Sequence, residues 1–130
     1  MKQEQSEYPI PTDLEGCFNT LDLIMNDSDP KDFKWFKETK ESDCIAQVHH
    51  GLGTHLRNSW GLWKKESPLY IYFNNMGLWH ADDMSSVIIV SYHRYLNGKK
   101  LNLKKQIDKY ISYWNKYQKE NGPISLGNDD

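Results

Sequence analysis

The chain has 130 residues, enough for one domain with its own core. No apolar run approaches the roughly 18 residues that a membrane span needs, and the polar, acidic start is unlike a secretory signal, so we expect a cytoplasmic protein without a membrane segment. The net charge of −2 argues against a dedicated nucleic-acid binder, because such proteins carry a basic excess.

The first half of the chain predicts three helices. Thr12 and Glu15 have the spacing of a capping box, and apolar residues follow at three- and four-residue steps to residue 25. Asp29 is expected to cap a short second helix that begins at Pro30. A third helix runs from residues 42–43 to about residue 59 and contains two glycines, at 51 and 53. Each of them costs up to about 1 kcal/mol relative to alanine, so we expect close approach by a neighbouring backbone and a central position for this helix.

The second half predicts three more helices. The fourth covers residues 69–76, although residues 70–73 could also form a strand. The fifth is capped by Asp82 or Asp83, ends at residues 97–98, and is apolar nearly all round, which indicates burial. The sixth begins at Asn102 and ends before residue 122. The sequence therefore predicts an all-α, compact single-domain bundle of five or six helices over residues 11–121, with a flexible lead-in at 1–10 and a flexible tail at 122–130.

Both arginines of the chain lie in two dense stretches of glycine, aromatic and polar residues, at 51–63 and 80–95. The other fourteen of the sixteen cationic residues are lysines. Since the guanidinium fork suits fixed bidentate contacts, we expect Arg57 to pair with Asp82 or Asp83 and so pin the third helix to the start of the fifth. The alternative is that Arg57 grips a ligand carboxylate or phosphate.

No constellation of catalytic residues is recognisable. The serines follow no nucleophile-elbow pattern, and the first three of the five histidines lack the i, i+4 pairing of a helical metal site. Asp82 and Asp83 could act as acid and base, but helix capping explains at least one of them. Cys17 and Cys44 lie in unrelated segments, and we interpret them as reduced thiols rather than a disulfide or metal ligands. We therefore assign no catalytic residue, metal or cofactor.

Several polar and aromatic residues are candidates for binding a partner or ligand. Trp63 and Trp79 lie in connectors between helices, where exposed tryptophans act as interface anchors, whereas Trp60 and Phe73 are expected in the core. The candidate residues are Arg57, Asn58, Trp63, Trp79, His80, Asp82, Asp83 and Arg94.

The two dense stretches resemble a small bacterial domain family of unknown function. Its pattern reads GLGxxIRNNWGLW, then HPDDMSS, then SYHRYLNGK, and the resemblance covers roughly residues 45–117. This chain has Ser59 where the family has asparagine and Ala81 where it has proline. The resemblance implies a compact stand-alone domain, a profile similar to that of immunity proteins.

Our first functional hypothesis is a non-enzymatic protein-binding module, in particular an immunity protein that neutralises a toxin by direct binding. Acidic residues Asp22, Asp27, Asp29 and Asp32 could steer a basic toxin domain, or could simply cap helices on a solvated face. The alternative is a small enzyme or ligand-binding domain with a polar pocket around Arg57, His80, Asp82, Asp83 and Arg94. Regulatory nucleic-acid binding would need lysines of the second and sixth helices to share one face.

Overall fold

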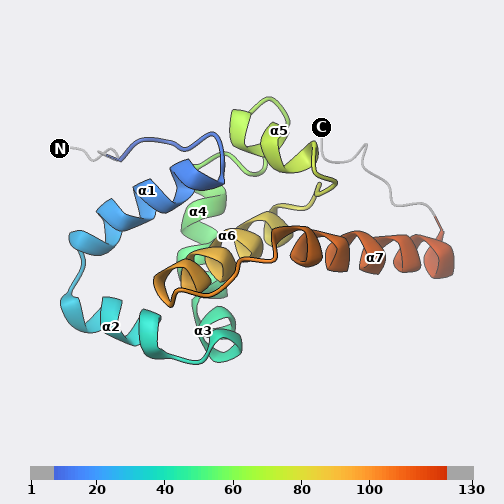
Figure 1. The fold of residues 1–130 in the computed structure, drawn as a ribbon. Coiled ribbons are helices and arrows are strands. Elements are labelled where there is room, and N and C mark those ends of the chain that lie inside the picture. The colour runs from blue at the N-terminus through green and yellow to red at the C-terminus, as the bar shows by residue number, and fades with distance from the viewer. Residues whose placement is uncertain (1–7, 123–130) are drawn as a thin grey trace.

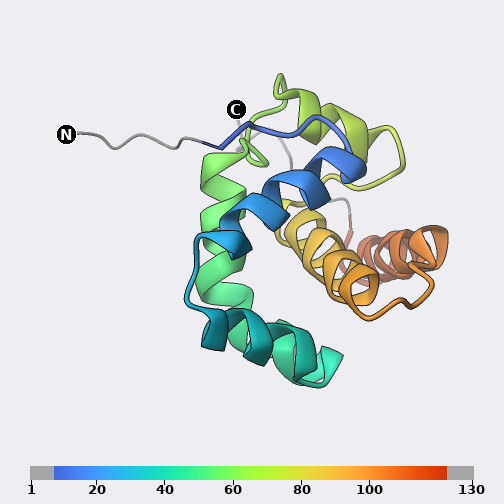
Figure 2. The ribbon, with the colours of Figure 1, turned by 60° about the vertical axis from the view of Figure 1, so that its left-hand side comes forward.

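The computed structural model describes residues 8–122, and this part of the chain contains helices and no strand. Three consecutive segments run as one continuous rod, seen upright in Figure 2, so the described residues form six helical rods. The predicted all-α bundle is thus confirmed. The ends of the predicted lead-in and tail, residues 1–7 and 123–130, lie outside the described residues. The elements are α1 (Leu14–Asn26), α2 (Pro30–Glu38), α3 (Glu41–Val48), the π-helix η1 (His49–Gly53), α4 (Thr54–Ser59), α5 (Pro68–Asn74), α6 (Ala81–Leu96) and α7 (Leu103–Asn121).

The first two helices begin at acidic caps. Asp29 accepts a hydrogen bond from the backbone N–H of Lys31 at 2.9 Å, with Pro30 at the first helical position, as predicted. The prediction that Thr12 caps α1 is wrong by one residue. Asp13 has the extended backbone of a cap, and its carboxylate accepts from the N–H of Gly16 at 2.8 Å. A carboxylate at this end also faces the positive end of the helix dipole.

Helix α6 is the centre of the molecule and contacts every other helix (Figure 1). Nine of its sixteen residues are buried, which agrees with its apolar character nearly all round. We expected the helix through residues 42–59 to be central. Instead, α3, η1 and α4 pack along α6, because this rod keeps one polar, exposed face while α6 does not.

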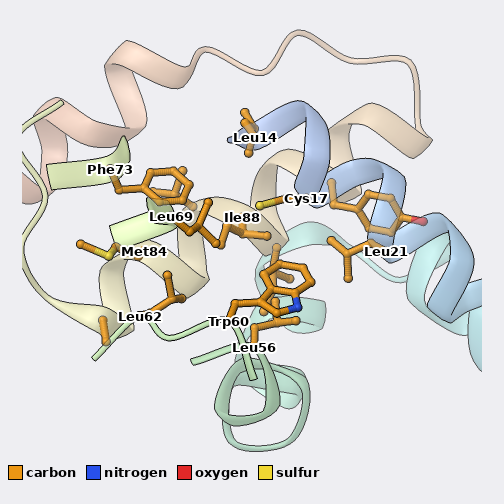
Figure 3. Packing of buried hydrophobic residues seen from close by; sticks show 14 of the residues in the cluster. Leu14, Cys17, Leu21, Leu56, Trp60, Leu62, Leu69, Phe73, Met84 and Ile88 are labelled. Carbon is orange, nitrogen blue, oxygen red and sulfur yellow. The ribbon is translucent and has the colours of Figure 1, made fainter. Parts of the chain in front are cut away.

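A single hydrophobic core surrounds α6 (Figure 3). Trp60 and Phe73 are 3% and 0% exposed, which confirms their predicted core positions, and residues 70–73 belong to helix α5. Cys17 and Cys44 are both free and buried, and burial raises the pKa of the Cys44 thiol to about 11. Both cysteines therefore serve as small apolar core residues.

The two glycines of the long rod have different roles. A Cβ atom on Gly51 would meet no atom within 4 Å, whereas one on Gly53 would lie 3.0 Å from Nη1 of Arg57. The expected close approach of a neighbouring backbone is thus wrong. Gly53, which has no Cβ atom, leaves space for the guanidinium group of Arg57 in the same rod.

Helix α7 extends away from the rest of the fold (Figure 1). Ile107, near its start, is its only buried residue, and α7 packs against α6 and against the connector at residues 77–80. Among the described residues, none of the helices is long and apolar enough to span a membrane.

Candidate functional site

Arg57 is buried where α4 meets the start of α6. Its Nη1 donates to Ser85 Oγ at 2.8 Å, and its Nη2 donates to Thr54 Oγ1 at 2.9 Å and to the His49 carbonyl at 3.4 Å. Its Nε lies 3.2 Å from Asp82 Oδ1 but makes no aligned hydrogen bond, so this contact is an ion pair alone. The predicted pairing of Arg57 with Asp82 or Asp83 is confirmed for Asp82, and it joins the two dense stretches of the sequence.

The first turn of α6 presents two carboxylates and a histidine cap. His80, rather than either aspartate, is the cap, since its Nδ1 accepts from the N–H of Asp82 at 3.2 Å. The imidazole ring stacks on Trp114 of α7, with centroids 5.4 Å apart and planes 14° apart. On the same side, Asp83 Oδ2 accepts a hydrogen bond from Trp114 Nε1 at 2.8 Å. Desolvation raises the pKa of Asp83, and the bond from the indole partly offsets this effect.

Aromatic rings gather where α7 crosses the start of α6. Trp114 is the hub, since its ring centroid lies 5.0 Å from that of Trp79 and 4.9 Å and 5.5 Å from those of Tyr113 and Tyr117. Tyr113 and Tyr117 are 56% and 41% exposed. We call this group, together with His80, the aromatic edge. Its α7 members were not predicted as site residues, because the stripe that includes Trp114 and Tyr117 is also typical of a core-facing helix.

A surface cavity of about 250 Å³ lies next to the aromatic edge. It opens between the turn before α6 and the middle of α7. The lining residues combine aromatic rings, amides and a single charged group, and they are Gly77, Leu78, Trp79, Asp83, Tyr110, Ile111, Trp114, Asn115 and Gln118. Burial and the nearby Asp83 carboxylate raise the pKa of Tyr110.

Arg94 lies at the other end of α6, twelve residues or about 18 Å along the helix from Asp82. Its Nε and Nη2 donate to the Glu41 carboxylate at 2.8 and 3.1 Å, and its Nη1 donates to the Leu101 carbonyl at 2.7 Å. The hydrogen bond from Arg94 holds the pKa of Glu41 below its usual value. The structure thus separates Arg94 from Arg57, His80, Asp82 and Asp83, and the single polar pocket of the alternative hypothesis is not assembled.

Of the remaining candidates, Asn58 and Trp63 lie apart from the aromatic edge, whereas Trp79 belongs to it. Trp63 is 58% exposed, in line with its position in a connector, and its Nε1 donates to Asn58 Oδ1 at 3.0 Å. Trp79 is half-buried against Trp114. Between residues 8 and 122, no ring contact connects Trp63 with the aromatic edge, and no three His, Cys, Asp or Glu side chains gather as metal ligands would.

The acidic cluster is partly occupied by bonds within the fold. Asp22 accepts from the Tyr92 hydroxyl at 2.7 Å, Asp27 accepts from the Tyr8 hydroxyl at 2.6 Å, and Asp29 caps α2. Asp32 is exposed in the first turn of α2. Three of the four carboxylates therefore have a structural function.

The model of a protein family, Domain of unknown function (DUF6794), matches residues 10–96. The match includes every candidate residue predicted from the sequence and stops before α7, so α7 contributes a wall of the cavity from outside the matched region. No curated protein and no solved structure matches the chain.

Proposed function

The chain belongs to the DUF6794 family, and we propose that it is a non-enzymatic protein-binding module. The most specific form of this proposal is a cytoplasmic immunity protein that neutralises a toxin domain by direct binding. The single observation that supports binding best is the aromatic edge, which presents partly exposed rings from the projecting helix α7 and from the connector before α6. Tyrosine and tryptophan are enriched at interface cores and dominate their energetics.

The hydrogen bonds of the central polar residues support the same proposal. A general acid, a base or an oxyanion donor must reach the reacting atoms of a substrate. Arg57 and Arg94 instead direct their guanidinium groups at acceptors within the fold, and His80 directs Nδ1 at its own helix. The hydrogen bonds of these side chains are explained by a structural role, and binding is therefore proposed for exposed rings of the aromatic edge such as Tyr113 and Tyr117.

A partner that binds here would cover the exposed faces of Tyr113 and Tyr117. Both side chains lie on α7 and are partly exposed, whereas the buried residue of this helix is Ile107. Replacing the two tyrosines by alanine is therefore expected to leave the fold intact. Truncating such an anchor typically costs 2 kcal/mol or more of binding free energy, or about thirtyfold in Kd.

The test uses the full chain as bait in lysate from its source cells, followed by titration of the captured protein in purified form. Tyr113→Ala/Tyr117→Ala should lose the partner while circular dichroism stays unchanged. Ile71→Ala, which removes an exposed apolar side chain from α5, should retain it. A partner that binds the double variant as tightly as the wild type would show that the aromatic edge is not the interface. The immunity form further requires that co-expression of this chain protects cells from the partner.

A further inference from the structure

We propose that the cavity beside Asp83 binds an alkylammonium group, such as the end of a lysine side chain. Three of the lining residues are aromatic, namely Trp79, Tyr110 and Trp114, and Asp83 is the only lining residue with a formal charge at neutral pH. A cation over the face of a tryptophan or tyrosine is attracted by the ring quadrupole, and more strongly when it is desolvated. A carboxylate among such rings adds a direct charge partner for the same group.

Asp83 differs from the two carboxylates next to α6 that are paired with arginines. Asp82 has Arg57 beside it and Glu41 has Arg94, whereas no ion pair joins Asp83 to a cation in the described part of the chain. The indole of Trp114 occupies Oδ2, and Oδ1 accepts no hydrogen bond from the described residues. A half-buried carboxylate with one oxygen still available is a site where an incoming N–H donor gains both a hydrogen bond and a charge.

The neighbouring titratable groups leave the site negative. His80 and Asp82 act on Asp83 through space in opposite directions, the first lowering and the second raising its pKa. Lys109 lies with its Nζ 5.7 Å from the ring centroid of Tyr110 but does not line this cavity. Residues 8–122 thus bring no cation into the space next to Asp83.

The walls of the cavity are held by close packing. Gly77, at φ +112°, is so near α7 that a Cβ atom on it would lie 2.6 Å from Cδ1 of Ile111. Leu78 and Ile111 supply apolar surface along which the methylene stem of a lysine can pack. A volume of about 250 Å³ accommodates such a side chain but not a large ligand.

The same ammonium chemistry has two sources, a free small amine or a lysine on a bound protein. The second source rests on the proposed function, because the cavity adjoins the aromatic edge and a lysine of the partner would enter it when the edge is covered. The cavity itself can be tested without any partner, so the two proposals fail separately.

The experiment titrates the full ¹⁵N-labelled chain with three probes and follows the indole N–H signal of Trp114, assigned with the Trp114→Phe variant. The probes are N-acetyl-lysine amide, its uncharged counterpart N-acetyl-norleucine amide, and n-butylammonium. Asp83→Asn is the test variant, since an amide oxygen can still accept the indole hydrogen bond without the charge. Asp22→Asn is the matched control, because Asp22 also accepts from an aromatic side chain but lies outside the cavity.

We expect a saturable shift with N-acetyl-lysine amide, at least tenfold weaker binding of N-acetyl-norleucine amide, and about tenfold weaker binding of the lysine probe to Asp83→Asn. Asp22→Asn should bind as the wild type does. Equal binding of n-butylammonium would identify the ammonium group alone as the ligand, whereas tighter binding of the lysine amide would indicate a peptide source. Equal affinity of the lysine and norleucine probes, unchanged binding to Asp83→Asn, or no shift with any probe would overturn the proposal.

Discussion

Replacing Arg57 by lysine tests whether this residue pins α4 to α6. Arg57 is 5% exposed and makes three hydrogen bonds together with an ion pair, and they connect η1, α4 and α6. A lysine keeps the charge but has a single nitrogen, which cannot reach Ser85, Thr54 and Asp82 at once.

The expected magnitude follows from the contacts that are lost. A hydrogen bond to a charged group contributes roughly 1.5–3 kcal/mol, and the weakest of the three bonds, at 3.4 Å, contributes less. Losing two bonds, partly offset by relaxation around the lysine, should lower the free energy of unfolding by about 3 kcal/mol. For a domain of this size that corresponds to a fall in Tm of roughly 10 °C.

The assay is thermal unfolding followed by circular dichroism, with urea unfolding as a second measure. Arg94→Lys is the matched control, since Arg94 also bonds a carboxylate and a carbonyl but its side chain is 23% exposed. We expect Arg94→Lys to lower the free energy of unfolding by about 1 kcal/mol, because solvent compensates part of the lost hydrogen bonding. A decrease in the free energy of unfolding below about 1 kcal/mol in Arg57→Lys, or an equal decrease in both variants, would refute the argument that the buried guanidinium holds α4 against α6.

Two further predictions concern backbone and charge. Gly51→Ala should raise the free energy of unfolding by up to about 1 kcal/mol, because a Cβ atom at this position meets open space. Gly53→Ala should lower it, since a Cβ atom there would lie 3.0 Å from the guanidinium of Arg57. Melting curves of the two variants that shift in the same direction would contradict this prediction. Because burial raises the pKa of Asp83 above 3.8, this carboxyl favours folding when protonated, and the benefit is lost as the pH rises through its folded pKa. The Tm of Asp83→Asn should therefore rise relative to that of the wild type as the pH increases above 3.8, and a pH-independent difference would contradict the assignment.

Much of the helical architecture could be predicted from the sequence because each helix carries its own local signals. Apolar spacing located all six rods, glycines marked the ends of the last four, and Asp29 with Pro30 fixed the start of α2. The cap of α6 was harder to predict, since His80 uses a ring nitrogen while two more usual capping residues follow it directly. A choice between adjacent candidates depends on backbone angles that the sequence does not state.

The candidate site was predicted only where one pair of residues dominated. Arg57 could be paired with Asp82 or Asp83 because one of only two arginines lies in one dense stretch and both carboxylates lie in the other, and the structure shows that the partner is Asp82. The cavity beside Asp83 could not be predicted, since it depends on where α7 crosses α6, and Trp114 looked like an ordinary core residue. Phe36 is the only buried residue of α2 and Trp35 is 39% exposed, because a short helix can bury only one narrow stripe.

The π-helix η1 sets the rotational phase between the two halves of the long rod. Each residue of an α-helix turns the chain by about 100°, and a π-helical turn contains one residue more per hydrogen-bonded ring than an α-helical turn. Removing one residue from His49–Gly53 would restore a regular helix, and because the π-turn accommodates its extra residue locally, α4 would keep nearly the same rotation relative to α3. Cys44 of α3 and Leu56 of α4 are both 0% exposed although they lie twelve residues apart, a spacing that in a regular α-helix would place them about 120° apart around the axis. The π-turn therefore allows a rod of this length to bury both side chains, and a regular helix with the same number of residues would turn one of them away from the core.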